Sequence, residues 1–256
     1  MRALVLLLAL LAAPAAACTG KTQCDLDGRA YHVREPAGWN GTAPLAVQLH
    51  FHGWGRTGLV PVESERTGRA ASEAGVLFVA PTGLRGSWDF RRRDSEDTPF
   101  AEAILEDVAA RYPIDGPLIV SGYSWGALMA ARFACETDSR IDALLLIAGA
   151  FPPGLPCDGR PARISHVHGT TDTVLDFPYG PGGETTQAVA LWRELFACGA
   201  EDRRFEWKAV EWLTHTRHEW DCDGALVTMD VHDASHLIPR GWVARHLSEI
   251  LDGRPG

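Results

Sequence analysis

Short runs of consecutive apolar residues alternate along this chain with segments of helical periodicity, and this alternation constrains the fold more than any other feature. A strand that is apolar on both faces is typical of a sheet covered by helices on both sides. Strands that alternate with helices form βαβ units with parallel strands. The sequence therefore predicts an α/β protein with a doubly wound, mostly parallel sheet and helices on both faces.

The expected elements span most of the chain. Strands are expected at residues 30–35, 45–53, 75–81, 117–122, 142–149, 162–169 and 225–231. Helices are expected at residues 63–75, 102–112, 125–135, 185–197 and 242–251. No repeat, low-complexity tract or long linker divides them, so we expect residues 18–256 to form a single domain. In sheets of this kind, functional side chains collect on loops at the carboxyl ends of the strands.

Ser124 lies where an expected strand passes into an expected helix, in the stretch LIVSGYSWGALMAARF. Glycines at positions 122 and 126 would relieve the crowding of a strained strand-to-helix turn. The helix that follows points its amide end at the serine, which favours a developing oxyanion. A serine becomes a nucleophile when a base accepts its proton. We therefore interpret Ser124 as a nucleophile rather than as part of an ordinary turn.

A second glycine-rich loop, His52-Gly53-Trp54-Gly55, follows the second expected strand. An oxyanion hole on such a sheet takes one amide from the residue after the nucleophile and one from an earlier loop. We expect the backbone N–H groups of Trp125 and Trp54 in these two roles. The alternative is a glycine turn that carries a partly exposed tryptophan. The histidines at positions 50 and 52 precede the serine and are expected to be structural.

The acid and the base should follow the nucleophile, in that order. Asp172 lies just past an expected strand and is the predicted acid, with Asp158 and Asp176 as competing positions. His236 is the predicted base and is favoured over His232, because His232 directly ends a strand whereas His236 lies in the loop beyond it. The remaining histidines of the C-terminal half are expected on the surface or on helices: His215, His218 and His246.

Four motifs occur in the order in which one known family carries them: HFHGWG, GYSWG, HGTTD and a terminal H-x-x-x-H-x-x-P-x-G-W. From about Arg29 to Trp242, the chain resembles exported α/β-hydrolases of the polyhydroxybutyrate depolymerase and feruloyl esterase type. The resemblance implies the α/β-hydrolase fold and a serine esterase that uses the serine, aspartate and histidine predicted above. Such chemistry needs no metal or organic cofactor.

Two departures from the family pattern bear on the substrate. Trp125 stands where a small amide side chain is common, and Ala127 stands where a further glycine is common. The loop before the base reads Asp233-Ala234-Ser235 instead of being rich in glycine. Trp125 is therefore expected to reshape the acyl pocket.

The chain has nine tryptophans, several of them in or near loops at the expected active-site end. Aromatic side chains there would form a platform for a polyester chain or a phenolic acyl group. The alternative is that these tryptophans cap the core. Besides Trp54 and Trp125, we expect Trp88 and Trp242 to contact the substrate.

The expected substrates are hydroxyalkanoate polyesters or oligomers and feruloyl-type aryl esters. One alternative is a serine peptidase on the same fold, which would normally need a gating domain or a charged pocket for a peptide terminus. Another is a non-catalytic binding protein of the hydrolase fold, which would usually lack a member of the triad.

The first residues, MRALVLLLALLAAPAAAC, have the pattern of a secretory signal peptide. A positive n-region, a short apolar stretch and an A-x-A cleavage site follow one another, and the apolar stretch is too short to span a membrane. Residues 1–17 are expected to be removed, so that the protein is secreted or periplasmic. Cys18 would then be the first residue of the mature protein. A lipid anchor on Cys18 is the less favoured alternative, because lipoprotein signals usually carry leucine where this chain has Ala15.

The chain has six cysteines, an even number that suggests disulfides in an exported protein. No Cys or Cys/His cluster has zinc spacing. Proximity in sequence favours three pairs: Cys18–Cys24, Cys135–Cys157 and Cys198–Cys222.

The formal net charge of −9 makes the chain a poor binder of nucleic acid. Its one basic cluster, Arg91-Arg92-Arg93, is followed closely by acidic residues. We expect this cluster to be a solvated loop with local ion pairs rather than an anion site.

Overall fold

The computed structural model describes residues 18–151 and 156–253. The predicted signal peptide, residues 1–17, lies outside the described residues. A ten-stranded sheet runs through the molecule in the order β1-β2-β4-β3-β5-β6-β7-β10-β9-β8. Its strands are β1 (Cys24–Leu26), β2 (Arg29–Arg34), β3 (Leu45–Phe51), β4 (Val76–Pro81), β5 (Ile114–Tyr123), β6 (Ala143–Ile147), β7 (Arg163–Gly169), β8 (Arg203–Val210), β9 (Leu213–Cys222) and β10 (Ala225–His232).

The centre of the sheet is parallel, from β4 through β3, β5, β6 and β7 to β10. The two strands at each edge join it antiparallel. The predicted doubly wound, mostly parallel sheet is therefore confirmed. β3, β4, β6 and β7 are buried along their whole length, as continuous apolar runs lead one to expect.

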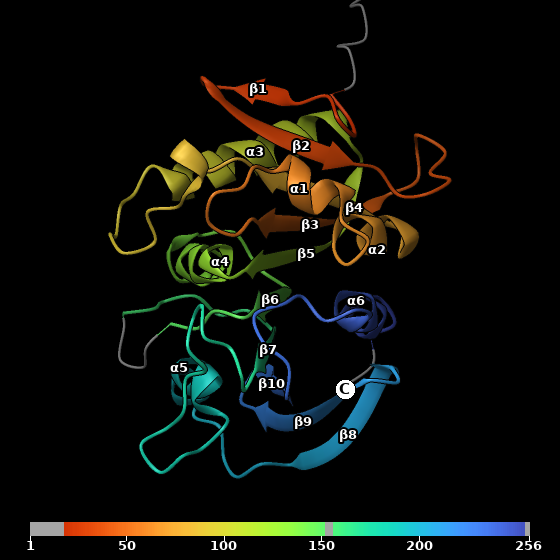
Figure 1. Ribbon diagram of the computed structural model, residues 1–256. Helices are drawn as coiled ribbons and strands as arrows, with labels where there is room; N and C mark the ends of the chain where they lie inside the picture. Colours follow the sequence, from red (N-terminus) through yellow and green to blue (C-terminus); the bar gives the residue numbers. More distant parts are fainter. Residues whose placement is uncertain (1–17, 152–155, 254–256) are drawn as a thin grey trace, which may run out of the picture.

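Helices cover both faces, as Figure 1 shows for α4 and α5 on one side and α2 and α6 on the other. The helices are α1 (Leu59–Glu63), α2 (Gly68–Glu73), α3 (Asp97–Arg111), α4 (Trp125–Glu136), α5 (Ala190–Leu195) and α6 (Trp242–Leu251), with short 3₁₀ turns η1 (Leu84–Gly86) and η2 (Gln187–Val189). The helix expected at 63–75 is thus the shorter α2, preceded by α1, which ends at Glu63. The helix expected at 185–197 is a 3₁₀ turn followed by a short helix. In the described part of the chain, no helix is both long enough and apolar enough to cross a bilayer.

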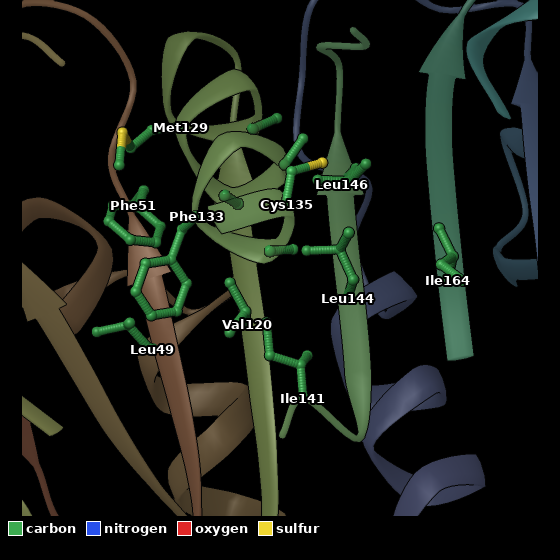
Figure 2. Close-up of a cluster of buried hydrophobic side chains, with 14 of the residues drawn as sticks. Leu49, Phe51, Val120, Met129, Phe133, Cys135, Ile141, Leu144, Leu146 and Ile164 are labelled. Atoms are coloured by element: carbon green, nitrogen blue, oxygen red, sulfur yellow. The ribbon is translucent and has the colours of Figure 1, made fainter. Parts of the chain in front are cut away.

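α4 is fixed to the centre of the sheet by apolar packing (Figure 2). Its residues Met129 and Phe133 are fully buried beside Phe51 of β3, Val120 of β5 and Leu146 of β6. Burying an aliphatic or aromatic side chain of this size contributes about 1.5–3 kcal/mol. The junction between β5 and α4, where Ser124 lies, is therefore held rigidly.

The β8–β9 hairpin was not expected from the sequence. β8 alternates exposed and half-buried residues, and β9 turns charged and polar side chains inward. These strands carry no apolar run that would mark them. His215 and His218 lie on β9 and His246 on α6, and all three are buried, so the expectation of a surface position is wrong for the two strand residues.

A buried ion pair joins this hairpin to the sheet. Arg217 of β9 donates from Nε to Asp230 Oδ1 (3.0 Å) and from Nη2 to Oδ2 (2.9 Å), and it also pairs with Glu249 of α6. Trp242 donates its indole N–H to Asp230 Oδ2 (2.7 Å) and is fully buried. The expected contact of Trp242 with substrate is therefore wrong, because the Asp230 carboxylate and the α6 packing hold its indole inside the protein.

Replacing Asp230 with Asn is expected to lower the free energy of unfolding by about 3–5 kcal/mol, because it removes the carboxylate that accepts two hydrogen bonds from the buried Arg217 guanidinium. Urea denaturation measures the loss. The control is Glu65→Gln, which breaks an exposed pair with Arg240 (3.1 Å) and is expected to cost about 0–1 kcal/mol. A loss for Asp230→Asn no larger than that of the control would contradict this account of the network.

The effect of Asp230→Asn should also depend on pH. Burial acts to raise the pKa of Asp230, but the hydrogen bond with His246 and the charge of Arg217 outweigh it and hold the pKa below its usual value. The carboxylate therefore stabilises the protein above its unfolded-state pKa of about 4, and this contribution is lost as the pH falls further. The difference between wild type and variant should narrow below about pH 4.

Three disulfides close surface segments of the described chain. The pairs are the ones that proximity in sequence favours: Cys18–Cys24, Cys135–Cys157 and Cys198–Cys222. Cys135 lies in the last turn of α4, so its disulfide ties that helix to the segment after β6.

Candidate active site

Ser124 stands on a strained turn between β5 and α4. Its backbone has φ 56° and ψ −122°, a conformation that costs a non-glycine residue on the order of 1–3 kcal/mol. Glycine is required on both sides of this turn. A Cβ at Gly122 would lie 2.1 Å from the carbonyl oxygen of Gly126, and a Cβ at Gly126 would lie 2.0 Å from that of Phe51. The turn therefore presents the serine hydroxyl at the carboxyl edge of the sheet.

The three side chains predicted as nucleophile, acid and base lie in one hydrogen-bonded line. His236 Nε2 is 2.8 Å from Ser124 Oγ, and His236 Nδ1 is 2.6 Å from Asp172 Oδ2. Asp172 follows β7 and His236 follows β10, and these strands are neighbours in the sheet. With Nδ1–H donated to the carboxylate, the lone pair of Nε2 is free to accept the hydroxyl hydrogen of Ser124.

The competing positions lie apart from this line. Asp158 and Asp176 are both exposed, and Asp158 pairs with Arg93 at 3.5 Å. His232 is buried inside β10, where its Nδ1 accepts a hydrogen bond from the Ala234 N–H at 3.2 Å.

The Asp172 carboxylate is held by backbone as well as by side chains. Its Oδ1 accepts from the N–H groups of Val174 (2.9 Å) and Leu175 (3.2 Å). Burial acts to raise the pKa of Asp172, but the hydrogen bonds from His236 and Val174 outweigh it and keep the pKa below its usual value. The group is therefore ionised at neutral pH, as a partner for a histidine that takes up a proton must be.

Tyr123, the residue before the serine, contacts the His236 loop. Its hydroxyl donates to the His236 carbonyl oxygen at 3.1 Å, and the two ring centroids are 5.0 Å apart. Burial, with the nearby Asp172 charge, raises the pKa of Tyr123 to about 12, so that the hydroxyl keeps its proton. Tyr123 was not predicted as a site residue, because a tyrosine beside a motif serine has no distinguishing sequence pattern.

Replacing Tyr123 with Phe is expected to lower kcat about 2- to 10-fold, since one neutral hydrogen bond that positions the His236 loop is worth about 0.5–1.5 kcal/mol. Steady-state kinetics on a p-nitrophenyl ester measure the change. Tyr112→Phe is the matched control, because the Tyr112 hydroxyl makes a bond of the same length (3.1 Å) to Glu35. Equal kcat losses in both variants would contradict a positioning role for Tyr123.

The loop His52–Gly55 runs directly beside the serine. A Cβ on Gly53 would lie 3.6 Å from the Ser124 Cβ. His52 fixes the loop, since its Nδ1 donates to the Gly53 carbonyl (2.8 Å) and its Nε2 accepts from the Gly83 N–H (3.0 Å). The indole of Trp54, next along the loop, is 71% exposed. The loop thus brings Gly53 close to the serine, and Trp54, the next residue, is exposed to solvent.

Trp88 supports this loop from inside the protein. It is buried and donates its indole N–H to the His52 carbonyl at 2.8 Å, with its ring edge-on to Phe51. The expected contact of Trp88 with substrate is therefore wrong, because the indole is enclosed in the core beneath the loop.

Trp125 is half-buried at the first position of α4. Its ring packs edge-on against Phe90 (centroids 4.9 Å apart), and the Arg91 guanidinium lies 5.0 Å from its centroid. The first N–H groups of a helix have no partner within the helix. Trp125 directly follows Ser124 at the start of α4, so its N–H is one of these first groups.

A hollow of about 170 Å³ adjoins the serine turn. Leu128 of α4, Gly149, Leu175 and Pro178 contribute to its walls. It abuts the serine backbone, because a Cβ on Gly149 would lie 2.5 Å from the Ser124 carbonyl oxygen. Pockets that enclose drug-sized ligands usually have a volume of about 300–1,000 Å³.

A larger cavity, of about 850 Å³, lies away from the serine turn. Its lining includes Pro117 and Leu226, which lie near the beginnings of β5 and β10.

Within residues 18–151 and 156–253, no three His, Cys, Asp or Glu side chains are grouped so that they could hold a metal ion.

Sequence comparison finds relatives among the feruloyl esterases. The chain is 28% identical over 164 residues to the probable feruloyl esterase C of Aspergillus niger, a match that covers 61% of this chain and 59% of that protein. It is 30% identical, with the same coverage, to the probable feruloyl esterase C of Aspergillus terreus. The chain thus spans about three fifths of the length of these relatives. No protein-family model matches it.

The comparison with solved structures agrees on the architecture. The acetyl xylan esterase from Aspergillus awamori aligns over 87% of this chain and 93% of its own, with a TM-score of 0.66 and 15% sequence identity. At this identity the likeness establishes the fold alone. The chain is thus similar in sequence to feruloyl esterases, and its architecture is that of the α/β-hydrolase fold.

Proposed function

We propose that the protein is an exported serine esterase that hydrolyses carboxylic esters through an acyl-enzyme. The observation that carries this proposal is the hydrogen-bonded line from Ser124 through His236 to Asp172 on a strained strand-to-helix turn. Nucleophile and base within hydrogen-bond reach, with the base oriented by a third group, is the arrangement that nucleophilic catalysis requires.

In the proposed reaction, Ser124 Oγ attacks the ester carbonyl carbon while His236 Nε2 accepts its proton. The N–H groups of Trp125 and Trp54 stabilise the oxyanion. His236 then gives the proton to the departing alcohol, and Asp172 stabilises the transient imidazolium. A water molecule attacks the acyl-enzyme with help from His236, which releases the acid and restores the serine.

The hollow beside Ser124 favours esters of short acyl groups. Its volume of about 170 Å³ is below that of pockets that enclose drug-sized ligands. We therefore expect short acyl groups to be preferred over bulky aryl groups. Hydroxyalkanoate oligomers and feruloyl-type aryl esters are the two substrate classes that we propose to compare.

Export fits the three disulfides, because such bonds persist in oxidising compartments and are rare in the cytosol. We place the protein outside the cytoplasm, secreted or periplasmic, after removal of residues 1–17. Mass spectrometry of the N-terminus of the exported protein tests this, and an acylated Cys18 would indicate a lipid anchor instead.

The test of the activity is hydrolysis of p-nitrophenyl acetate and butyrate, methyl ferulate, hydroxybutyrate oligomers and a peptide p-nitroanilide panel by wild type. Esterase activity with no cleavage of the anilides supports the proposal. Cleavage of anilides alone would favour a peptidase, and activity on nothing in the panel would favour a binding protein. Among the esters, higher kcat/KM for acetate than for ferulate is expected from the small hollow.

A further inference from the structure

A second histidine contacts the carboxylate that faces His236. His168 lies on β7 with its side chain fully enclosed, and its Nε2 is 3.0 Å from Asp172 Oδ2 and 3.1 Å from the Leu175 carbonyl oxygen. A carbonyl oxygen can only accept. Nε2 of His168 therefore carries a hydrogen, which it shares between the two oxygens.

The other ring nitrogen of His168 is an acceptor. Burial lowers the pKa of His168, so that the ring is neutral near pH 7 and Nδ1 carries a lone pair. His166, two residues earlier on the same face of β7, places its Nε2 3.4 Å from this Nδ1, with the two rings stacked. Burial also lowers the pKa of His166, so that this ring is neutral too. Because Nδ1 of His168 can only accept, a hydrogen bond between the two rings requires the hydrogen on Nε2 of His166. Both histidines thus donate in the direction of Asp172.

The carboxylate then receives four hydrogen bonds. Oδ1 accepts from the N–H groups of Val174 and Leu175, and Oδ2 accepts from His168 and His236. A carboxylate has about four lone-pair sites, so all of its capacity is used. Asp172 therefore has no freedom to rotate Oδ2 away from His236 Nδ1 without breaking bonds on both oxygens.

We propose that His168, as the neutral Nε2–H tautomer held by His166, is a positioning residue that fixes Asp172 Oδ2 against the catalytic base. This inference rests on the proposed function. His168 is then a neutral hydrogen-bond donor to Asp172, in addition to the three residues that carry the chemistry. The role of the buried pair His166 and His168 is to hold Asp172 in position.

The first test compares His168→Leu with His168→Gln. Leucine removes the donor, and a misplacement of catalytic groups of this kind costs about 10²-fold in rate. We expect this loss in kcat with KM unchanged. Glutamine places an amide N–H where Nε2 stands and should restore kcat to within about tenfold of wild type. A kcat in His168→Leu equal to that of wild type, or no recovery with glutamine, would overturn the proposal.

The second test asks whether His168 acts through Asp172. In an Asp172→Asn background, His168→Leu should cause almost no further loss in kcat, because the carboxylate that it positions is gone. Equal losses in the two backgrounds would show that the effect of His168 is a general one on the structure. His218 supplies the matched control: it is another buried strand histidine beside a carboxylate (Glu201, 3.1 Å), and His218→Leu is expected to keep kcat.

The third test needs no catalysis. Long-range ¹H–¹⁵N NMR of wild type, with the His168 signals assigned from His168→Gln, should show a neutral ring protonated at Nε2 at pH 7. An Nδ1–H tautomer or an imidazolium would overturn the proposal. A wild type that hydrolyses no ester would refute the proposed function but would leave this spectrum readable, so the two failures are distinguishable.

Discussion

Replacing Ser124 with Ala is expected to lower kcat on the best ester by on the order of 10⁶-fold, because loss of the nucleophile removes the whole acyl-enzyme route at once. The backbone of Ser124 is strained, and a side chain at either flanking glycine would clash with backbone atoms. The turn therefore costs conformational energy, and its result is the presentation of this one hydroxyl. What activity persists would come from the oxyanion donors and substrate binding alone. Steady-state kinetics with p-nitrophenyl acetate measure the loss.

The matched control for this prediction is Ser121→Ala on β5, three residues before Ser124. The Ser121 hydroxyl is buried and contacts Gln48 and His50 at 2.9 Å, so its loss affects stability rather than chemistry. We expect kcat of Ser121→Ala to stay within a few-fold of wild type. A Ser124→Ala enzyme that retains as much activity as this control would contradict the assignment of the nucleophile.

Replacing Asp172 with Asn is expected to lower kcat by about 10⁴-fold through the wrong histidine tautomer. The backbone N–H groups of Val174 and Leu175 cannot give up their hydrogens, whereas the imidazoles that face Oδ2 can change tautomer. We therefore expect the amide oxygen at the Oδ1 position and the NH₂ group facing His236. His236 Nδ1 would then have to accept, which places the imidazole hydrogen on Nε2, facing Ser124 Oγ. The base would point a hydrogen at the hydroxyl whose proton it should take.

Asp176→Asn is the control for this change, since Asp176 lies four residues away and is exposed. It should keep wild-type kinetics. Circular dichroism and thermal unfolding should show that Asp172→Asn is folded, so that its loss is one of rate. A kcat for Asp172→Asn within tenfold of wild type would contradict the proposed tautomer mechanism.

The central sheet could be predicted because its strands are buried on both faces and therefore read as continuous apolar runs. The β8–β9 hairpin could not, because its inward positions include Arg217 and Glu219, whose burial depends on partners distant in sequence. In the sequence alone, Arg217 cannot be told from a surface arginine, because its burial depends on the carboxylates of β10 and α6 that surround it in the fold.

The candidate site shows the same division. The serine turn has a local pattern of glycines, and the predicted acid and base follow from chain order, so the proximity of Ser124, Asp172 and His236 could be predicted. The burial of Trp88 and Trp242 could not be predicted, because each indole donates a hydrogen bond to an acceptor in another part of the chain. The acceptor is the His52 carbonyl for Trp88 and the Asp230 carboxylate for Trp242. His168 stands in the HGTTD motif, but its contact with Asp172 appears only once the turn after β7 is folded.

The most direct test of the account is covalent labelling by a fluorophosphonate, which forms a stable adduct with an activated serine. Wild type should gain the mass of one adduct, and peptide mapping should place it on Ser124. Ser124→Ala should gain none, and Asp172→Asn should label far more slowly. No adduct on wild type, or an adduct on any other residue, would contradict the claim that Ser124 is an activated nucleophile.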